Sequence, residues 1–507
     1  MNLDHDTCYK ILTERVPGFD GRFFIGVHTT GIYCRPICRA RIPKQQNISF
    51  YPSAAAAHAA GFRPCLRCHP EGAPEFAAQQ GAAATVTRAL TVIRDGENSI
   101  TAVAARVGTD EAHLLRLFEQ QLGASPPVVA QTRRVLFAQQ LLMETAMPAD
   151  EIALAAGFGS VGNLNTTIQT LFGRPLTELR RTHLKHGTRR AANGITLSLA
   201  YAPPYDWETL ARFLAARAIP GVEGVDNQGH YHRIITLNGA HGQLTVSPQA
   251  NQHRLRVDIR FPEAALLASI VNRVRHLFDL GCDPGAVTMH LARDSRLQPL
   301  VTTRPGLRVP GAWDGFELAV RAILGQQITV GAATTLAGKL VAAHGEQISF
   351  DAPSGLTHSF PTPQRLAEVD LRSLGMPPAR AVALSALASA AVDNPKLFSP
   401  YPTLEATVAA MRALRGIGEW TAQYIAMRAF REPDAFPTGD IGLLRAMADE
   451  NGTRPSAEEL LARAQVWRPW RAYAALYLWS SEFSQSVLRR SPSPAPLRAI
   501  TNAAPRA

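Results

Sequence analysis

The chain has 507 residues, of which 46% are hydrophobic and 18% charged, and its formal net charge is +11 at pH 7. This length is too great for one hydrophobic core, so we expect three or four globular domains, and the positive charge favours a polyanionic partner. No apolar run approaches the roughly 20 residues of a membrane span, and the N-terminal MNLDHDTCYK lacks the features of a signal peptide, which predicts a cytoplasmic protein.

Four of the six cysteines form two close pairs, C-x3-C and C-x2-C. These are Cys34, Cys38, Cys65 and Cys68. In a reducing compartment the spacing favours a metal over disulfides, and four thiolates in a tetrahedral array are a typical zinc ligand set. A purely structural zinc explains the cysteines but not the surrounding arginines, which can offset the negative charge of the centre and reach toward phosphate. These arginines are Arg35, Arg39, Arg41, Arg63 and Arg67.

The run TTGIYCRPICRAR, followed by NISFYPSAAAAHAAGFRPCLRCHPE, resembles the N-terminal domain of Ada-type methyl phosphotriester sensors. The resemblance implies one zinc ion on the four cysteines and a domain over residues 1–80. It also implies that Cys34 is the methyl acceptor, which reacts once per molecule and thereby lowers the repulsion between the site and DNA. The expected DNA contacts around it are Arg35, Arg39, Arg63 and Arg67.

The stretch SITAVAARVGTDEAHLLRLFEQQLGASP predicts two helices joined by a turn at Gly108. Its apolar residues follow helical spacing on both sides of the turn. A second copy, DEIALAAGFGS followed by NLNTTIQTLFGRP, comes after a connecting helix expected at about residues 128–143. Any two-helix unit can show such stripes, so the pattern alone leaves both a helix-turn-helix and an unrelated pair of helices open.

The phrases ALAAGFGS and LFGRPLTELRR resemble the AraC-type DNA-binding domain, here residues 81–185. The resemblance implies that the second helix of each copy enters the major groove, with DNA contacts from His113, Arg116, Asn163 and Asn165. The second copy offers no arginine for reading bases and departs from the family at positions 162, 164 and 168, so we expect weak reading of regulatory DNA by this half. The basic segment 186–194 is expected to be a linker.

Between residues 195 and 305 the alternating runs ITLSLAY, HRIITLN, GQLTVS and HRLRVDIR predict an antiparallel sheet, with helices at about 207–218 and 262–278. The lone Cys282 is expected to be packed rather than reactive. Residues 306–487 have a helical pattern, and the Pro- and Ala-rich tail 488–507 is predicted to be disordered.

The stretch LRGIGEWTAQYIAMRAF, with PTGDIGLLRAM soon after it, resembles the helix-hairpin-helix DNA glycosylases of the AlkA type, which are 3-methyladenine DNA glycosylases II. The resemblance covers essentially the whole C-terminal half. It implies that Asp440 is the catalytic carboxylate and that Trp420, Tyr424 and Trp479 line the base pocket. Gly416 and Gly418 would form the hairpin that binds DNA. Asp440 also has a simpler interpretation as a helix N-cap, and the two roles are compatible.

The residue types agree with that chemistry, because electron-rich rings hold a cationic alkylated purine by stacking and cation–π attraction. Trp420 stands where relatives that also cleave the strand have a lysine, which predicts a monofunctional hydrolase. Gln327 falls where this type inserts an apolar wedge into the duplex. The backbone carbonyls of Arg412, Leu414 and Ile417 could hold a monovalent cation. In the segment WRPWRAY, we expect the tryptophans and the tyrosine to pack in the core.

The sequence therefore predicts a multidomain α+β protein: a small zinc-binding α/β module, an all-α AraC-type double helix-turn-helix, an antiparallel-sheet domain of the AlkA N-terminal type, and an all-α helix-hairpin-helix glycosylase domain. The predicted function is excision of alkylated purines from double-stranded DNA, combined with methyl acceptance from methyl phosphotriesters. The protein is also expected to regulate transcription at promoter DNA and to be a monomer. The PCHRV signature of O6-methylguanine transferases is absent. The alternatives are a lesion-binding regulator that excises no base, and a glycosylase whose zinc is merely structural.

Overall fold

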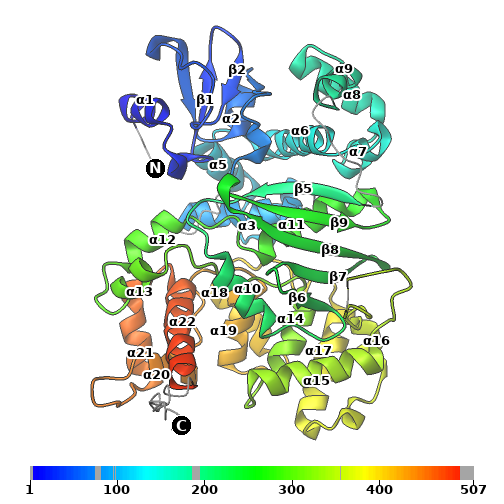
Figure 1. Ribbon diagram of the computed structural model, residues 1–507, viewed down its shortest axis with the longest axis vertical. Helices are drawn as coiled ribbons and strands as arrows, with labels where there is room; N and C mark the ends of the chain where they lie inside the picture. Colours follow the sequence, from blue (N-terminus) through cyan, green and yellow to red (C-terminus); the bar gives the residue numbers. More distant parts are fainter. Residues whose placement is uncertain are drawn as a thin grey trace, which may run out of the picture.

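The computed structural model describes residues 4–74, 81–94, 96–97, 99–184, 194–353 and 355–490, with no description of the side chains of residues 81–83, 181–184 and 482–490 (Figure 1). Almost all of the expected linker at 186–194 and of the expected tail at 488–507 lies outside these ranges. No helix within them is long and apolar enough to cross a membrane. The predicted multidomain α+β class is confirmed.

The N-terminal module is a small sheet flanked by two helices, with strand order β3-β1-β2-β4. Its elements are α1 (His5–Glu14), η1 (Pro17–Phe19), β1 (Phe24–Val27), β2 (Ile32–Cys34), η2 (Gln45–Asn47), β3 (Ile48–Tyr51), α2 (Ala54–Ala59), β4 (Arg63–Pro64) and η3 (Pro70–Gly72). Strands β2 and β4 are parallel, with Tyr33 opposite Pro64. The chain therefore leaves both strands at the same edge, next to Cys34 and Cys65.

Two helix-turn-helix units follow, as predicted. Their helices are α3 (Gly81–Arg94), α4 (Ile100–Arg106), α5 (Glu111–Leu122), α6 (Pro126–Glu144), α7 (Ala149–Ala155), α8 (Val161–Phe172) and α9 (Leu176–Leu184). Asp110 and Ser160 cap α5 and α8 by accepting hydrogen bonds from backbone N–H groups, and Gly108 supplies the positive φ of +71° that the first turn requires. The apolar stripes of both units are buried, which confirms the helical periodicity.

The next domain contains a five-stranded antiparallel sheet of order β5-β9-β8-β7-β6. Its elements are β5 (Ile195–Ala200), α10 (Trp207–Ala215), β6 (Glu223–Val225), β7 (Tyr231–Leu237), β8 (Ala240–Gln249), η4 (Ala250–Gln252), β9 (Arg254–Arg260), η5 (Ala264–Leu266) and α11 (Leu267–Leu277). Four strands and both helices match the sequence pattern. The three-residue edge strand β6 was not predicted.

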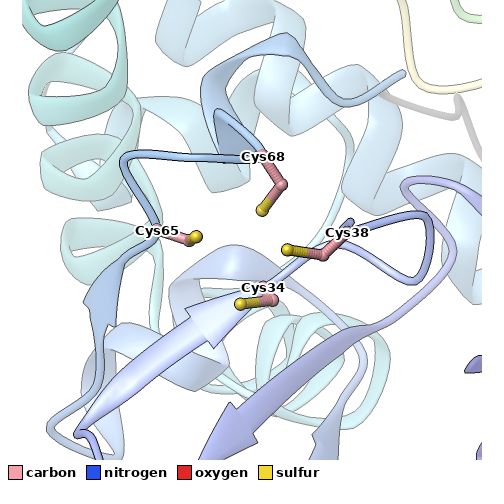
Figure 2. Close-up of side chains that lie close together, drawn as sticks. All are labelled: Cys34, Cys38, Cys65 and Cys68. Atoms are coloured by element: carbon pink, nitrogen blue, oxygen red, sulfur yellow. The ribbon is translucent and has the colours of Figure 1, made fainter. Parts of the chain in front are cut away.

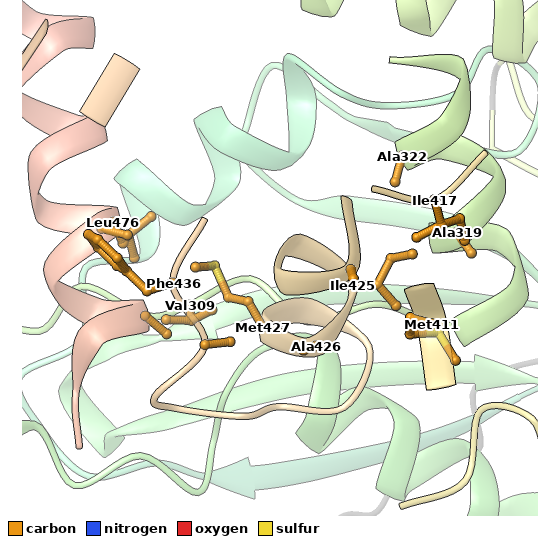
Figure 3. Packing of buried hydrophobic residues seen from close by; sticks show 14 of the residues in the cluster. Val309, Ala319, Ala322, Met411, Ile417, Ile425, Ala426, Met427, Phe436 and Leu476 are labelled. Atoms are coloured by element: carbon orange, nitrogen blue, oxygen red, sulfur yellow. The ribbon is translucent and has the colours of Figure 1, made fainter. Parts of the chain in front are cut away.

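The C-terminal domain is helical and packs around one large core. Its elements are α12 (Pro284–Leu291), α13 (Gln298–Thr303), α14 (Gly315–Leu324), α15 (Val330–His344), α16 (Pro363–Glu368), η6 (Leu371–Leu374), α17 (Pro378–Asp393), α18 (Leu404–Arg412), α19 (Glu419–Arg428), α20 (Ile441–Ala446), α21 (Ala457–Arg463), η7 (Ala464–Trp467) and α22 (Arg471–Arg490). Figure 3 shows Ile417 of the α18–α19 turn inside this core, near Ala322 and Ile425. Trp467, Trp470 and Tyr473 are buried, as expected for the WRPWRAY segment, and so is Cys282.

The second helix-turn-helix unit does not form a core of its own. Leu164 and Ile168 of α8 belong to the same buried cluster as Leu197 of β5 and Ile270 of α11. In Figure 1 the sheet β5–β9 lies between the two N-terminal modules and the C-terminal helices. The N-terminal and C-terminal halves are thus joined by shared apolar packing.

Candidate functional site

The four predicted zinc ligands converge at the edge where β2 and β4 end. The sulfur atoms of Cys34, Cys38, Cys65 and Cys68 all lie within 4.8 Å of one another, and Figure 2 shows them pointing toward a common centre. Zinc–sulfur bonds of about 2.3 Å place tetrahedral sulfurs about 3.8 Å apart, so the cluster fits a zinc ion with little adjustment. Cys38 and Cys65 are buried, whereas Cys34 and Cys68 are partly exposed.

Two arginines fasten the loops that carry these cysteines. Arg15 donates to the carbonyls of Cys38 and Ala40 at 3.0 and 3.1 Å. Arg35 is buried with a side-chain exposure of 7%, where it forms a two-point ion pair with Asp20 and donates to the carbonyl of Cys68 at 3.1 Å. The DNA contact expected of Arg35 stays a prediction, and in this structure its guanidinium is enclosed and braces the zinc loops.

The other predicted DNA contacts differ in how far they reach the surface. Within the described residues, Arg39 and Arg67 are exposed beside the cysteines, and Arg63 is half-buried. In the helix-turn-helix units His113, Arg116 and Asn163 are exposed, while Asn165 is half-buried and accepts a hydrogen bond from the Leu176 backbone at 3.2 Å. Leu66, between Cys65 and Cys68, packs against the cluster that contains α8.

A second site surrounds Asp440, which is the N-cap of α20. Its Oδ1 atom accepts from the backbone N–H groups of Gly442 and Leu443 at 2.8 and 3.0 Å. The indole of Trp479 donates to the same oxygen at 2.8 Å, and the indole of Trp420 donates to Oδ2 at 3.0 Å. The structure thus brings together the predicted carboxylate and two of the predicted aromatic residues, and it confirms the capping role as well.

The third predicted aromatic residue stacks on the first. The rings of Trp420 and Tyr424 lie 5.2 Å apart at an angle of 8°. Arg428 donates to the Tyr424 hydroxyl at 2.6 Å. Burial alone raises the pKa of Tyr424, but the guanidinium groups of Arg428 and Arg217 lower it, and the net pKa lies below the usual value of 10.0. These contacts fix the orientation of the Trp420 indole next to Asp440.

The hairpin between α18 and α19 lies beside the turn that carries Gln327. Gly416 has a φ of +81°, and an added Cβ would lie 2.4 Å from the Cβ of Ala383, so a side chain there would both strain the backbone and clash. Around Gly418 the space is open. Gln327 is exposed at a φ of +58°, and the neighbouring Gln326 donates to the Gly416 carbonyl at 2.9 Å.

Several supporting residues were missed by reasoning from the sequence. Asp20, Arg15 and Gln326 hold functional loops through contacts between segments that are distant in the chain. Gly442 lies so close to Trp479 that an added Cβ would sit 3.3 Å from the indole. Local sequence gives no signal for these roles.

Four family models match the chain. They are the metal binding domain of Ada over residues 7–71, a helix-turn-helix domain over residues 103–182, the AlkA N-terminal domain over residues 196–314, and the HhH-GPD superfamily of base excision DNA repair proteins over residues 320–472. Their order agrees with that of the predicted modules.

The chain is 36% identical over 486 residues to a probable bifunctional transcriptional activator/DNA repair enzyme AlkA of Mycobacterium tuberculosis, covering 95% of this chain and 97% of the relative. It is also 36% identical to DNA-3-methyladenine glycosylase 2 of Escherichia coli, over 56% of this chain and 97% of that protein. The bifunctional transcriptional activator/DNA repair enzyme Ada of E. coli is 39% identical over 31% of this chain and 43% of its own length. The solved structure of a 3-methyladenine DNA glycosylase from Archaeoglobus fulgidus shares the fold over 57% of this chain and 99% of its own, with a TM-score of 0.50 and 23% identity.

Proposed function

The chain belongs to the family of bifunctional transcriptional activator/DNA repair enzymes of the AlkA type, and from this premise we propose that it excises alkylated purines such as 3-methyladenine from DNA and also accepts methyl groups from DNA methyl phosphotriesters. The observation that carries the proposal is the convergence of two indoles on one carboxylate next to a helix-hairpin-helix turn. The four-cysteine cluster supports the second activity.

In the proposed excision reaction, a cationic base lies against the indoles of Trp420 and Trp479, where cation–π attraction favours the alkylated form. The bond between the base and the sugar C1′ breaks, and its electron pair neutralises the positive charge of the departing base. The Asp440 carboxylate stabilises the oxocarbenium-like sugar. A water molecule then adds to C1′ and gives up a proton, for which Asp440 is the nearby base.

In the proposed methyl transfer, the sulfur of Cys34 attacks the methyl carbon of a phosphotriester. A sulfur–carbon bond forms, the carbon–oxygen bond breaks, and the phosphodiester anion leaves with the electron pair. Bound zinc would keep the cysteine thiols deprotonated at neutral pH. Backbone N–H groups donate to the sulfurs of Cys68 and Cys65 at 3.4 Å, which lowers the nucleophilicity of those two thiolates.

We assign DNA contacts to exposed and half-buried residues near each site. At the zinc module these are Arg39 and Arg67, with Arg63 at its edge. At the helix-turn-helix units they are His113, Arg116, Asn163 and Asn165, which would face promoter DNA. At the hairpin they are Gly416 and Gly418, with Gln327 entering the duplex.

We further propose that the protein acts as a monomer in the cytoplasm, in domains that follow the boundaries predicted from the sequence. Sedimentation with and without promoter DNA tests the monomer and the promoter contact together.

The carbonyls of Arg412, Leu414 and Ile417 would hold a monovalent cation, whose positive charge would favour DNA binding at the hairpin. Carbonyl oxygens carry two lone pairs, so Leu414 can accept from the Ile417 N–H and still coordinate an ion. Replacing potassium and sodium by tetramethylammonium at constant ionic strength is expected to weaken binding to abasic-site DNA severalfold. An unchanged Kd would remove the cation from the proposal.

The function is tested by incubating the purified protein with methylated duplex DNA and measuring two products. Intact-protein mass spectrometry is expected to show one added methyl group per molecule, and chromatography is expected to show released 3-methyladenine in excess over the protein. Methyl uptake without released base would instead identify a lesion-binding regulator. Released base without methyl uptake would leave the zinc with a structural role alone.

A further inference from the structure

The first helix of the regulatory half makes a buried ionic contact with the glycosylase domain. Arg88 of α3 donates through Nε and Nη2 to Oε1 of Glu432 at 3.2 and 3.1 Å, and through Nη2 to Oε2 at 3.0 Å. The two residues are 344 positions apart in the chain. The contact has the two-point geometry that fixes an arginine and a carboxylate in one mutual orientation.

This ion pair is largely shielded from solvent. The side chains of Arg88 and Glu432 are 19% and 9% exposed. Burial raises the pKa of the Glu432 carboxyl, and Arg88 opposes that effect as its principal positive neighbour. Without Arg88, the Glu432 carboxylate would lose its principal positive neighbour while Glu405 and Asp434 remain nearby, so it would take up a proton or move toward solvent, and either response breaks the two-point contact.

Glu432 belongs to the segment Arg431–Phe436, which contacts both α19 and the start of α22, the helices that carry Trp420 and Trp479. On one side the segment contacts α19, the helix of Trp420 and Tyr424: the Glu432 N–H donates to the Ala426 carbonyl at 3.0 Å, and the Phe436 N–H donates to Oε1 of Gln423 at 3.0 Å. Figure 3 shows Phe436 packed near Met427, Val309 and Leu476.

On its other side the segment holds the start of α22, the helix of Trp479. The Pro433 carbonyl accepts from the Ala472 N–H at 2.9 Å. Asp434 accepts from Nε of Arg471 at 2.8 Å and from Nε of Arg468 at 2.7 Å. The chain then reaches Asp440 only four residues after Phe436. A displacement of this segment therefore moves the catalytic carboxylate relative to both indoles.

A second contact fixes the same part of the regulatory half. Arg106 of α4 donates to the Lys396 carbonyl at 2.8 Å, and a Cβ added at Gly108 would lie 2.7 Å from Pro402. Both partners belong to the connection between α17 and α18, which leads into the hairpin. These contacts of α4 and the following turn hold the regulatory half against the C-terminal domain independently of the Arg88–Glu432 pair.

We propose that Arg88 is a positioning residue for base excision: through Glu432 it sets the geometry of the segment that contacts the helices of Trp420 and Trp479. The regulatory half is then part of the machinery that aligns the excision site, in addition to its own contacts with DNA. This inference rests on the proposed glycosylase function, and it concerns the rate of excision within the bound complex.

The test is a double-mutant cycle on the full-length, zinc-loaded protein with R88M, E432Q and the R88M/E432Q double variant. The measurement is the single-turnover rate constant for 3-methyladenine release at saturating enzyme, well below the unfolding temperature. We expect each single variant to be about tenfold slower, since misplacement of an active-site group by about 1 Å costs on this scale or more. The double variant should be no slower than the slower single variant, because both substitutions break the same contact. R212M, at an exposed arginine paired with Glu208, is the matched control and should match the wild type.

Methyl uptake at the zinc module and the unfolding temperature are measured on the same samples. A role confined to stability would lower the unfolding temperature and leave the rate constant of the folded protein unchanged, and that result would overturn the proposal. So would single-variant effects that multiply in the double variant. A wild-type protein that releases no base would instead contradict the proposed function itself.

Discussion

Replacing Asp440 by asparagine is expected to slow the release of 3-methyladenine by on the order of 10³-fold, which corresponds to about 4 kcal/mol of lost transition-state stabilisation. The substitution removes the negative charge that faces the developing positive charge on the sugar. It also disturbs the local hydrogen bonds. Asparagine can still accept from Gly442, Leu443 and Trp479 through its oxygen, but its NH₂ group would then face the donating indole of Trp420.

The measurement is single-turnover base release, with circular dichroism to establish that α20 and its domain remain folded. D449N is the matched control. The Asp449 carboxylate also accepts backbone hydrogen bonds at a turn, but its donors are Asn451 and Thr453 rather than the indoles. The variant should retain the wild-type rate. A rate for D440N within tenfold of the wild type would show that the carboxylate is not the group that stabilises the sugar cation.

Features governed by local periodicity were accessible from the sequence. The apolar stripes around Gly108 predicted the first helix-turn-helix unit, and the copy that begins at Asp150 predicted the second, because the same spacing that packs a helix is visible in the chain. Asp440 could be singled out for two reasons. It precedes the helical run IGLLRAM as a capping residue, and it stands in the PTGD motif that resembles the helix-hairpin-helix glycosylases. The edge strand β6 was missed since three residues carry no recognisable alternation.

Features that depend on contacts between distant segments were not accessible. Arginines near a zinc cluster can face phosphate or brace the loops. Arg35 braces the loops because the fold places Asp20 beside it. The pairing of Arg88 with Glu432 has no local signature at all, since it arises when two domains pack together. The sequence therefore predicted residues that the structure brings together at each site, while the contacts that support them required the structure.

Replacing Cys34 by serine is expected to abolish methyl uptake from methylated DNA, since a serine hydroxyl is neutral at pH 7 and a far weaker nucleophile than a thiolate. Base release should continue, because Asp440 belongs to a separate domain. Of the two partly exposed sulfurs, that of Cys68 accepts an N–H from Arg35 at 3.4 Å, whereas no backbone donor to the Cys34 sulfur is found among the hydrogen bonds of the described residues. For this reason we expect Cys34 to be the more reactive of the two.

Loss of a ligand and loss of the nucleophile can be separated by measuring zinc content alongside methyl uptake. Cys34→Ser keeps three thiolates, so weakened zinc binding is restored with added zinc, while methyl uptake should stay absent. Cys8→Ala is the matched control: Cys8 is a buried core residue of the same module outside the cluster, and its loss should leave uptake intact. Tandem mass spectrometry of wild-type peptides then locates the methyl group. A methyl group on Cys68 would contradict the assignment and would mean that exposure to DNA, rather than freedom from N–H donors, selects the reactive sulfur.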